Sequence, residues 1–304
     1  MIFETFLTSV LPVGALFFLG LWMGRRHVFQ LQDATLFFKF VGQIAVPAII
    51  ISILISTDFT NSDITLIWLY LLVEFLIYGL GFMVAFFLFR LPVIYAVLIG
   101  MACSFSNHVL FVLPISDFIF DVSATLPLRG AIAIDTLSLT FSAILLDVIR
   151  AKQKGQSAQL ITHLKHPLLL CLIIGAPFVI GVLRAPVPMI RMADFIAATA
   201  APLALFASGI LLSQKVSAQG VKIAAMITII KMAIFPALAV VIILQISGYS
   251  LDEARTILMV AAAPVGLMPM TFASRYQVET ASIALSMLLS FILSLIALPI
   301  IASI

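Results

Sequence analysis

Residues 261–269 read Ala-Ala-Ala-Pro-Val-Gly-Leu-Met-Pro and lie in the middle of an apolar run at residues 254–274. Proline removes a backbone donor and clashes with the preceding helical turn, and glycine adds conformational freedom. Two prolines and a glycine within six residues therefore predict a helix that is interrupted at its centre. At membrane depth, such an interruption is tolerated only where the backbone lines a cavity or is buried in protein.

A second stretch of this kind lies in the first half of the chain. Residues 104–114 read Ser-Phe-Ser-Asn-His-Val-Leu-Phe-Val-Leu-Pro, a polar cluster inside the apolar run 92–116. We expect a helix that breaks and resumes here. The exposed N-terminus of a half-helix suits a carboxylate, and the Asn107 amide can both donate and accept hydrogen bonds. The alternative is a simple proline kink, with Asn107 bonding two helices together.

The two stretches belong to a wider correspondence between the halves. Three prolines and one glycine recur at an offset of 155 residues: Pro12 with Pro167, Pro47 with Pro202, Pro114 with Pro269, and Gly20 with Gly175. Recurrence at one offset indicates an internal duplication. Paired proline-interrupted segments in two halves are also the best sequence pointer to the substrate site of a transporter.

The composition places the chain in a membrane. Charged residues make up 10% and hydrophobic residues 63% of its 304 residues, and the mean hydropathy is +1.27. A soluble domain carries roughly 25% charged residues. We therefore predict an all-α polytopic membrane protein of about ten helices, with no soluble domain. Both cysteines, Cys103 and Cys171, lie in apolar segments, so we expect neither a disulfide nor a metal site, and no cofactor.

Ten apolar runs divide into five per half. They cover about 3–24, 35–56, 65–89, 92–116, 127–149, 167–183, 193–213, 221–246, 254–274 and 281–303. Basic residues gather in alternate loops, which predicts that those loops are cytoplasmic and that both termini lie outside. Five spans per half force the halves into opposite orientations. We expect a first repeat at 1–150, a basic cytoplasmic linker at 151–166 and an inverted second repeat at 167–304.

Five ionisable residues fall within the predicted spans, where charge is costly and by default marks a functional site or an ion pair. They are Lys39, Glu74, Asp135, Asp147 and Lys231. Lys39 and Asp147 lie near span ends and can reach the interface, so we interpret them as structural.

Three of the five remain candidates for function. Glu74 and Lys231 lie in equivalent spans of the two halves. They form an ion pair, or else Lys231 attracts an anion while Glu74 carries a proton. Asp135 begins a polar stripe with Ser138 and Ser142 at helical spacing. It either titrates during transport or accepts hydrogen bonds from a broken helix.

No enzyme motif appears in the chain. Helical H-E-x-x-H, G-x-S-x-G and Walker A patterns are all missing from the sequence, which argues against an enzyme and against self-contained ATP-driven transport. No motif in the sequence supports a membrane-embedded enzyme that acts on lipids. We also expect no cytoplasmic output domain of the kind that a signalling receptor needs.

Several segments are similar to the auxin efflux carrier family. Pro202-Leu203-Ala204-Leu205-Phe206 through Gly209 resembles the family's seventh span, and Lys231 through Pro236 resembles its eighth. Asn107 through Pro114 resembles the fourth span, Ala263-Pro264 through Tyr276 the ninth, and Val46-Pro47-Ala48 the second. The resemblance covers nearly the whole chain, and its short linker is typical of the compact bacterial form.

The resemblance implies a ten-span inverted repeat with broken helices crossing in spans 4 and 9. Spans 1, 2, 6 and 7 would form a scaffold, commonly a homodimer interface, and spans 3–5 and 8–10 a mobile transport unit. Family members carry small organic anions such as malonate or malate, which implies a secondary transporter in the inner membrane, with a small carboxylate and membrane lipid as partners and no nucleic acid. The implied substrate site comprises Ser106, Asn107, His108, Pro114, Pro264, Met268 and Pro269.

A cation-coupled carrier of the same fold is the alternative, with Glu74 or Asp135 binding Na⁺ or H⁺. The chain also departs from the family after Asn107, where relatives usually have small residues and this chain has His108-Val109-Leu110-Phe111. The bulk at this point alters the expected pocket. His108 either packs there or supplies proton sensitivity near neutral pH.

Overall fold

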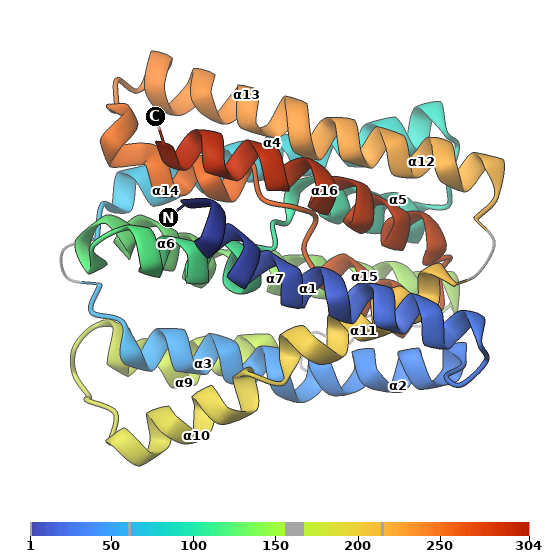
Figure 1. Ribbon diagram of the computed structural model, residues 1–304, viewed down its shortest axis with the longest axis horizontal. Helices are drawn as coiled ribbons and strands as arrows, with labels where there is room; N and C mark the ends of the chain where they lie inside the picture. Colours follow the sequence, from blue (N-terminus) through green and yellow to red (C-terminus); the bar gives the residue numbers. More distant parts are fainter. Residues whose placement is uncertain (1, 60–61, 156–166, 214–215, 304) are drawn as a thin grey trace.

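The computed structural model describes residues 2–59, 62–155, 167–213 and 216–303, without the side chains of residues 2–13, 110, 114, 118 and 122. The described chain is helical, and its helices run between two ends of the molecule (Figure 1). Within these ranges the β-structure consists of an isolated antiparallel bridge between Ser106 and Val265.

The helices of the first half include several π-helical turns, labelled η. They are α1 (Ile2–Arg25), α2 (Leu31–Phe40), η1 (Val41–Ala45), α3 (Val46–Ser56), α4 (Ile64–Met83), η2 (Val84–Leu88), α5 (Val93–Ser104), η3 (His108–Val112), α6 (Leu113–Ile119) and α7 (Val122–Gln153).

The described second half also consists of α-helices and π-helical turns. Its elements are α9 (Pro167–Val179), α10 (Val187–Ala197), α11 (Ala200–Leu212), α12 (Ala218–Ile229), η4 (Ile230–Ile234), α13 (Phe235–Ala239), η5 (Val240–Ile246), α14 (Leu251–Ala261), α15 (Met268–Tyr276) and α16 (Ala281–Ser303). Of the predicted linker, residues 156–166 lie outside the described chain.

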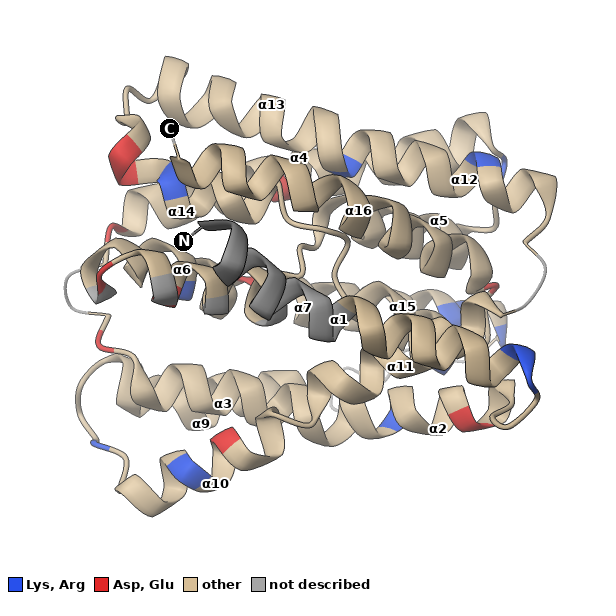
Figure 2. Cartoon of the chain, in the orientation of Figure 1, with Lys and Arg blue, Asp and Glu red and all other residues tan. Residues whose placement is uncertain are grey.

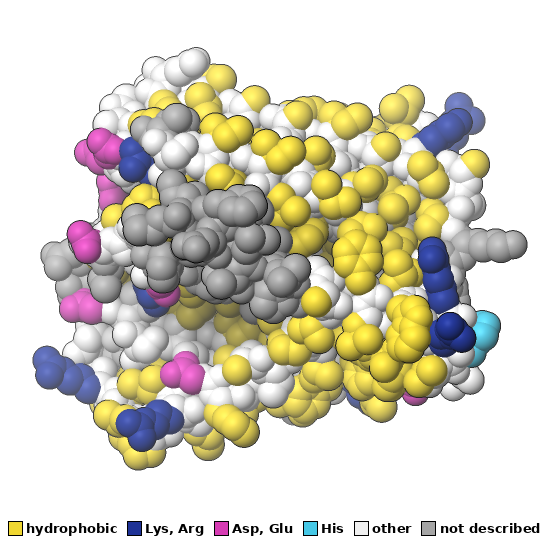
Figure 3. All heavy atoms as spheres, viewed as in Figure 1, with side chains coloured by type: hydrophobic (Ala, Val, Ile, Leu, Met, Phe, Trp, Pro, Cys, Tyr) yellow, Lys and Arg dark blue, Asp and Glu magenta, His cyan; other side chains and the backbone are white. Residues whose placement is uncertain are grey.

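The helices have the length and polarity of membrane spans. Six continuous helical segments of the described chain are long and apolar enough to cross a bilayer: 31–56, 64–88, 123–153, 187–212, 218–246 and 281–303. Most charged residues lie near the two ends of the molecule (Figure 2), and apolar side chains cover the surface between them (Figure 3). The predicted all-α, multi-pass membrane class is therefore confirmed.

Short polar loops set the helix starts at one end. The Asp63 carboxylate accepts hydrogen bonds from the backbone N–H groups of Thr65 (2.9 Å) and Leu66 (3.0 Å), which caps α4. Ser250 and Glu253 form a capping box that starts α14. These caps satisfy backbone donors that would otherwise be exposed at the ends of the helices.

Glycines allow close helix crossings at equivalent places in the two halves. A Cβ atom on Gly20 of α1 would overlap the Phe206 carbonyl of α11, and one on Gly209 of α11 would overlap the Phe17 carbonyl and lie 2.7 Å from Leu21 N. Gly175 of α9 approaches α3, where an added Cβ would lie 2.8 Å from the Leu54 Cβ. Small residues at such crossings let helix backbones pack closely in a membrane.

We predict that Gly209→Ala destabilises the protein by about 1–3 kcal/mol, because α1 and α11 must separate to admit the methyl group. The melting temperature of the detergent-purified protein measures the effect. Gly79→Ala is the matched control, since a Cβ at Gly79 of α4 meets no atom within 4 Å. Equal melting temperatures for the two variants would contradict the close crossing.

Candidate functional site

Two helix interruptions lie against each other inside the molecule. The backbone is non-helical at 105–107, between α5 and η3, and at 262–267, between α14 and α15. Asn107 N donates to the Pro264 carbonyl at 2.8 Å, and Gly266 N donates to the Phe105 carbonyl at 2.9 Å. Figure 1 places α5 and α15 toward one end of the molecule and α6 and α14 toward the other. The segment from α5 to α6 and the segment from α14 to α15 therefore pass each other here. We call residues 105–107 and 262–267 the crossover.

Gly266 leaves room for the close approach of the two backbones. A Cβ atom on Gly266 would lie 3.0 Å from the Ser106 carbonyl oxygen and 3.2 Å from the Phe105 carbonyl oxygen. The neighbouring Val265 N donates to Ser290 Oγ of α16 at 3.0 Å. The crossover therefore satisfies backbone donors partly within itself and partly through a side chain of the surrounding bundle.

Lys231 holds both sides of the crossover together. Its fully buried ammonium group donates to Ser106 Oγ at 2.7 Å and to the Ala261 carbonyl at 3.0 Å, and it lies 4.2 Å from the centre of the Phe235 ring. Ser106 Oγ in turn donates to the Val260 carbonyl at 2.6 Å. The described hydrogen bonds of the Lys231 side chain go to the crossover and its flanking helix, and no ion pair with Glu74 within 4.0 Å is found among the described residues.

A cluster of buried acids and hydroxyls lies beside the crossover. Asp135 Oδ2 of α7 accepts a hydrogen bond from Tyr70 Oη at 3.2 Å and contacts His108 Nε2 at 3.3 Å. Ser138 Oγ donates to Glu74 Oε2 at 3.3 Å. The stripe predicted on α7 thus faces α4, and Asp135 contacts the residue that restarts the broken helix.

A small cavity adjoins the crossover and the acid cluster. Its volume is about 80 Å³, more than the roughly 10–15 Å³ that a cavity needs to hold a water molecule. The structure places four predicted substrate residues and one predicted coupling residue on its lining: Ser106, Asn107, His108, Met268 and Asp135. Apolar side chains complete the wall.

The other predicted residues lie elsewhere. Pro264 and Asn107 line a crevice of about 20 Å³ on another face of the crossover. Pro269 is buried in the first turn of α15 and is not among the residues lining the cavity. Pro114 falls in the first turn of α6, and its side chain lies outside the described residues. Glu74 and Lys231 are buried but do not line the cavity.

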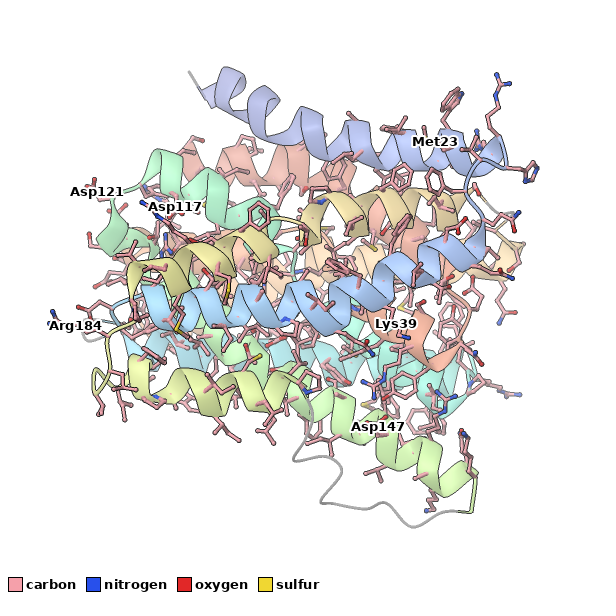
Figure 4. The ribbon with its side chains drawn as sticks, turned by 90° about the horizontal axis from the view of Figure 1, so that it is seen from below. Met23, Lys39, Asp117, Asp121, Asp147 and Arg184 are labelled. Atoms are coloured by element: carbon pink, nitrogen blue, oxygen red, sulfur yellow. The ribbon has the colours of Figure 1, made fainter. Side chains whose placement is uncertain are left out.

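A larger cavity, of about 810 Å³, lies beside the small one, and Met268 lines both. Lys39 and Arg275 are among its polar lining residues. Arg275 Nη2 lies 3.4 Å from Asp147 Oδ2, and Asp147 Oδ1 accepts a hydrogen bond from Tyr276 at 2.5 Å. Figure 4 shows Lys39 on α2 and Asp147 on α7 toward the same end of the molecule. The structural interpretation of Asp147 fits these contacts, whereas Lys39 faces a cavity.

Sequence reasoning missed Tyr70, Thr136, Gly266 and Ser290. Tyr70 lies one helical turn before Glu74, and Thr136 directly follows Asp135, so their positions beside two buried acids were a usable signal. Gly266 lay inside the quoted stretch, although its close approach to residues 105 and 106 needed the structure. Ser290 belongs to a stripe of serines on α16 at every fourth residue, a helical spacing that was also a usable signal.

A search of the curated proteins gave no match. Residues 156–302 match the family model described as "Membrane transport protein". That segment contains α14, α15 and Lys231, and so holds one side of the crossover. This match over the second half of the chain confirms the auxin efflux carrier resemblance of its motifs.

Proposed function

We propose that the protein is a secondary carrier that moves a small organic anion across the membrane, with the substrate held at the crossover. The observation that carries the proposal is the mutual hydrogen bonding of two interrupted helices beside a buried cavity. Interrupted helices cost backbone hydrogen bonds in a membrane and recur where transporters hold their substrates.

The chemistry of the cavity suits a carboxylate. The helix that resumes at His108 and the helix that begins at Met268 both start at its wall, so two helix N-termini lie beside it. Helix N-termini carry partial positive charge and unpaired amide donors. Asn107 adds a side-chain amide that can donate to a carboxylate oxygen. A mono- or dicarboxylate such as malonate or malate is the substrate class we propose.

The helices also support a ten-span architecture built from two inverted five-helix repeats. Each of the ten predicted spans corresponds to one helix or to a series of consecutive helical elements. The repeated glycines occupy matching places, since Gly20 brings the first span against the seventh and Gly175 brings the sixth against the second. We assign α1–α3 and α9–α11 to a scaffold that forms a homodimer, and the remaining helices to a transport unit.

Alternating access follows from the position of the cavities. The larger cavity is lined by α2, α9 and α11 of the proposed scaffold and by α15 of the proposed transport unit. It lies at the end where Lys39 and Arg275 are found, which we propose to be cytoplasmic in an inner membrane. Movement of the transport unit along the scaffold would close this route and open the site toward the opposite side.

Asn107→Ala is expected to lower the transport efficiency for malonate or malate about tenfold or more, because the variant loses one hydrogen bond to a charged ligand. Counterflow of the labelled anion in proteoliposomes measures it. Gln245→Ala, which removes an exposed amide far from the crossover, is the matched control. Transport by Asn107→Ala within twofold of the wild type, at equal reconstitution, would remove Asn107 from the site.

Lys231→Met is expected to destabilise the protein by about 3 kcal/mol, because it removes the donor to Ser106 Oγ and Ala261 O and leaves the buried acids without a cation. Thermal unfolding of the purified protein gives the measurement. Lys222→Met removes an exposed lysine from the same continuous helix and should leave stability within about 0.5 kcal/mol. Similar unfolding of both variants would show that the crossover does not depend on Lys231.

A further inference from the structure

The acid cluster contains two carboxyl groups that need a proton between them. Glu74 and Asp135 are 1% and 2% exposed, and Ser138, one helical turn after Asp135 on α7, donates to Glu74 Oε2 at 3.3 Å, which places the two carboxyl groups side by side. Two ionised carboxylates are acceptors only, whereas a protonated carboxyl group can donate. One oxygen of each group, Glu74 Oε1 and Asp135 Oδ1, has no donor among the described residues. A single shared proton supplies the donor that this contact lacks.

The charges of the cluster balance with that same proton. Lys231 is the cation beside the two acids, so the three residues sum to one negative charge when all are ionised. A proton shared by Glu74 and Asp135 brings the sum to zero. Because uncompensated charge in a membrane interior is expensive, the neutral arrangement is the one expected without substrate.

His108 connects this cluster to the cavity. Its ring is buried, lines the cavity with Asn107, and contacts Asp135 Oδ2 through Nε2 at 3.3 Å. The other ring nitrogen, Nδ1, is buried without a hydrogen-bond partner among the described residues. A carboxylate in the cavity would bring a second acceptor to the ring. The doubly protonated imidazole, with a donor on each nitrogen, fits two acceptors.

We propose that the carrier is coupled to protons: an anion binding at the crossover takes up one proton, held by His108 together with the Glu74–Asp135 carboxyl pair. The inference rests on the proposed function and names its driving ion. The added proton cancels one negative charge of the substrate, so that a monocarboxylate crosses the membrane without net charge. The proton reaches the cluster from water on one side of the membrane and is released to water with the substrate on the other side. Only N–H and O–H bonds form and break.

Other ionisable groups surround the cluster and bear on its proton balance. Tyr70 and Tyr78 face it from α4, Cys103 from α5 and Lys231 from η4. A sodium ion is the less suitable partner, because the Lys231 ammonium group, which donates to the Ala261 carbonyl and the Ser106 hydroxyl, would repel a second cation at these oxygens.

The test is calorimetric proton counting on the purified protein, with pyruvate and malonate as probes. Titrations in buffers of different ionisation enthalpy give the protons taken up per ligand bound. We expect about one proton per pyruvate, and an affinity that falls about tenfold per pH unit on the alkaline side, the slope for one linked proton. In His108→Gln, the uptake should disappear and the affinity should stay within twofold between about pH 6 and 8, where histidine ordinarily titrates.

The controls separate the two proposals. His27→Gln removes an exposed histidine and should keep the wild-type uptake. Ligand binding without proton uptake by the wild type, sodium-dependent binding in its place, or uptake that persists in both His108→Gln and Asp135→Asn would overturn proton coupling and leave the anion carrier intact. The absence of binding and of counterflow for every carboxylate tested would overturn both proposals. The number of protons that the wild type takes up per ligand decides whether transport is proton-coupled, so the test does not depend on whether a variant folds.

Discussion

The hydrogen bonds between the two interrupted helices are the constraint on which the rest of the structure depends. A bilayer offers no water to backbone groups, so an interruption at 105–107 is affordable only if another segment supplies its partners. Residues 262–267 supply them through the Pro264 carbonyl and the Gly266 amide, and Lys231 adds a charged donor to both sides. Neither interruption could be stable alone. Each half of the chain therefore supplies backbone partners that the interruption in the other half needs.

The same arrangement links the architecture to electrostatics. Lys231 is needed as a donor to the crossover, yet a buried ammonium group requires compensating negative charge. Glu74 and Asp135 provide that charge from α4 and α7, and they oversupply it by one. The excess acid beside a cavity that suits anions is difficult to explain as structural support alone, because it would repel the ligand. It becomes useful if the excess is the place where a proton is held.

The sequence predicted features that depend on local order and missed those that depend on contacts across the fold. Prolines, glycine and polar residues inside apolar runs located both interruptions, although the first lies at 105–107, several residues before Pro114. Pro114 directly follows the π-helical turn η3, and it is this turn that accommodates a proline within a helix running from 108 to 119. The partner of Lys231 could not be predicted, since Ser106 lies 125 residues away. The contact of His108 with Asp135 was equally hidden, because it depends on how the restarted helix faces α7.

The cavity wall is chemically divided in a way that bears on movement. Its polar lining residues, Ser106, Asn107, His108, Asp135 and Thr136, all belong to the proposed transport unit. The residues contributed by α2–α3 and α11 are all apolar, namely Val41, Val46, Ile49, Ile50 and Ala200. A ligand bonded to the first set would have no hydrogen bond to break with the second as the unit moves. An apolar wall also offers no alternative partner to a carboxylate, so the anion would stay with the moving helices. The division of the lining thus favours a substrate carried with the transport unit past a passive scaffold, instead of one passed between polar groups on two fixed walls.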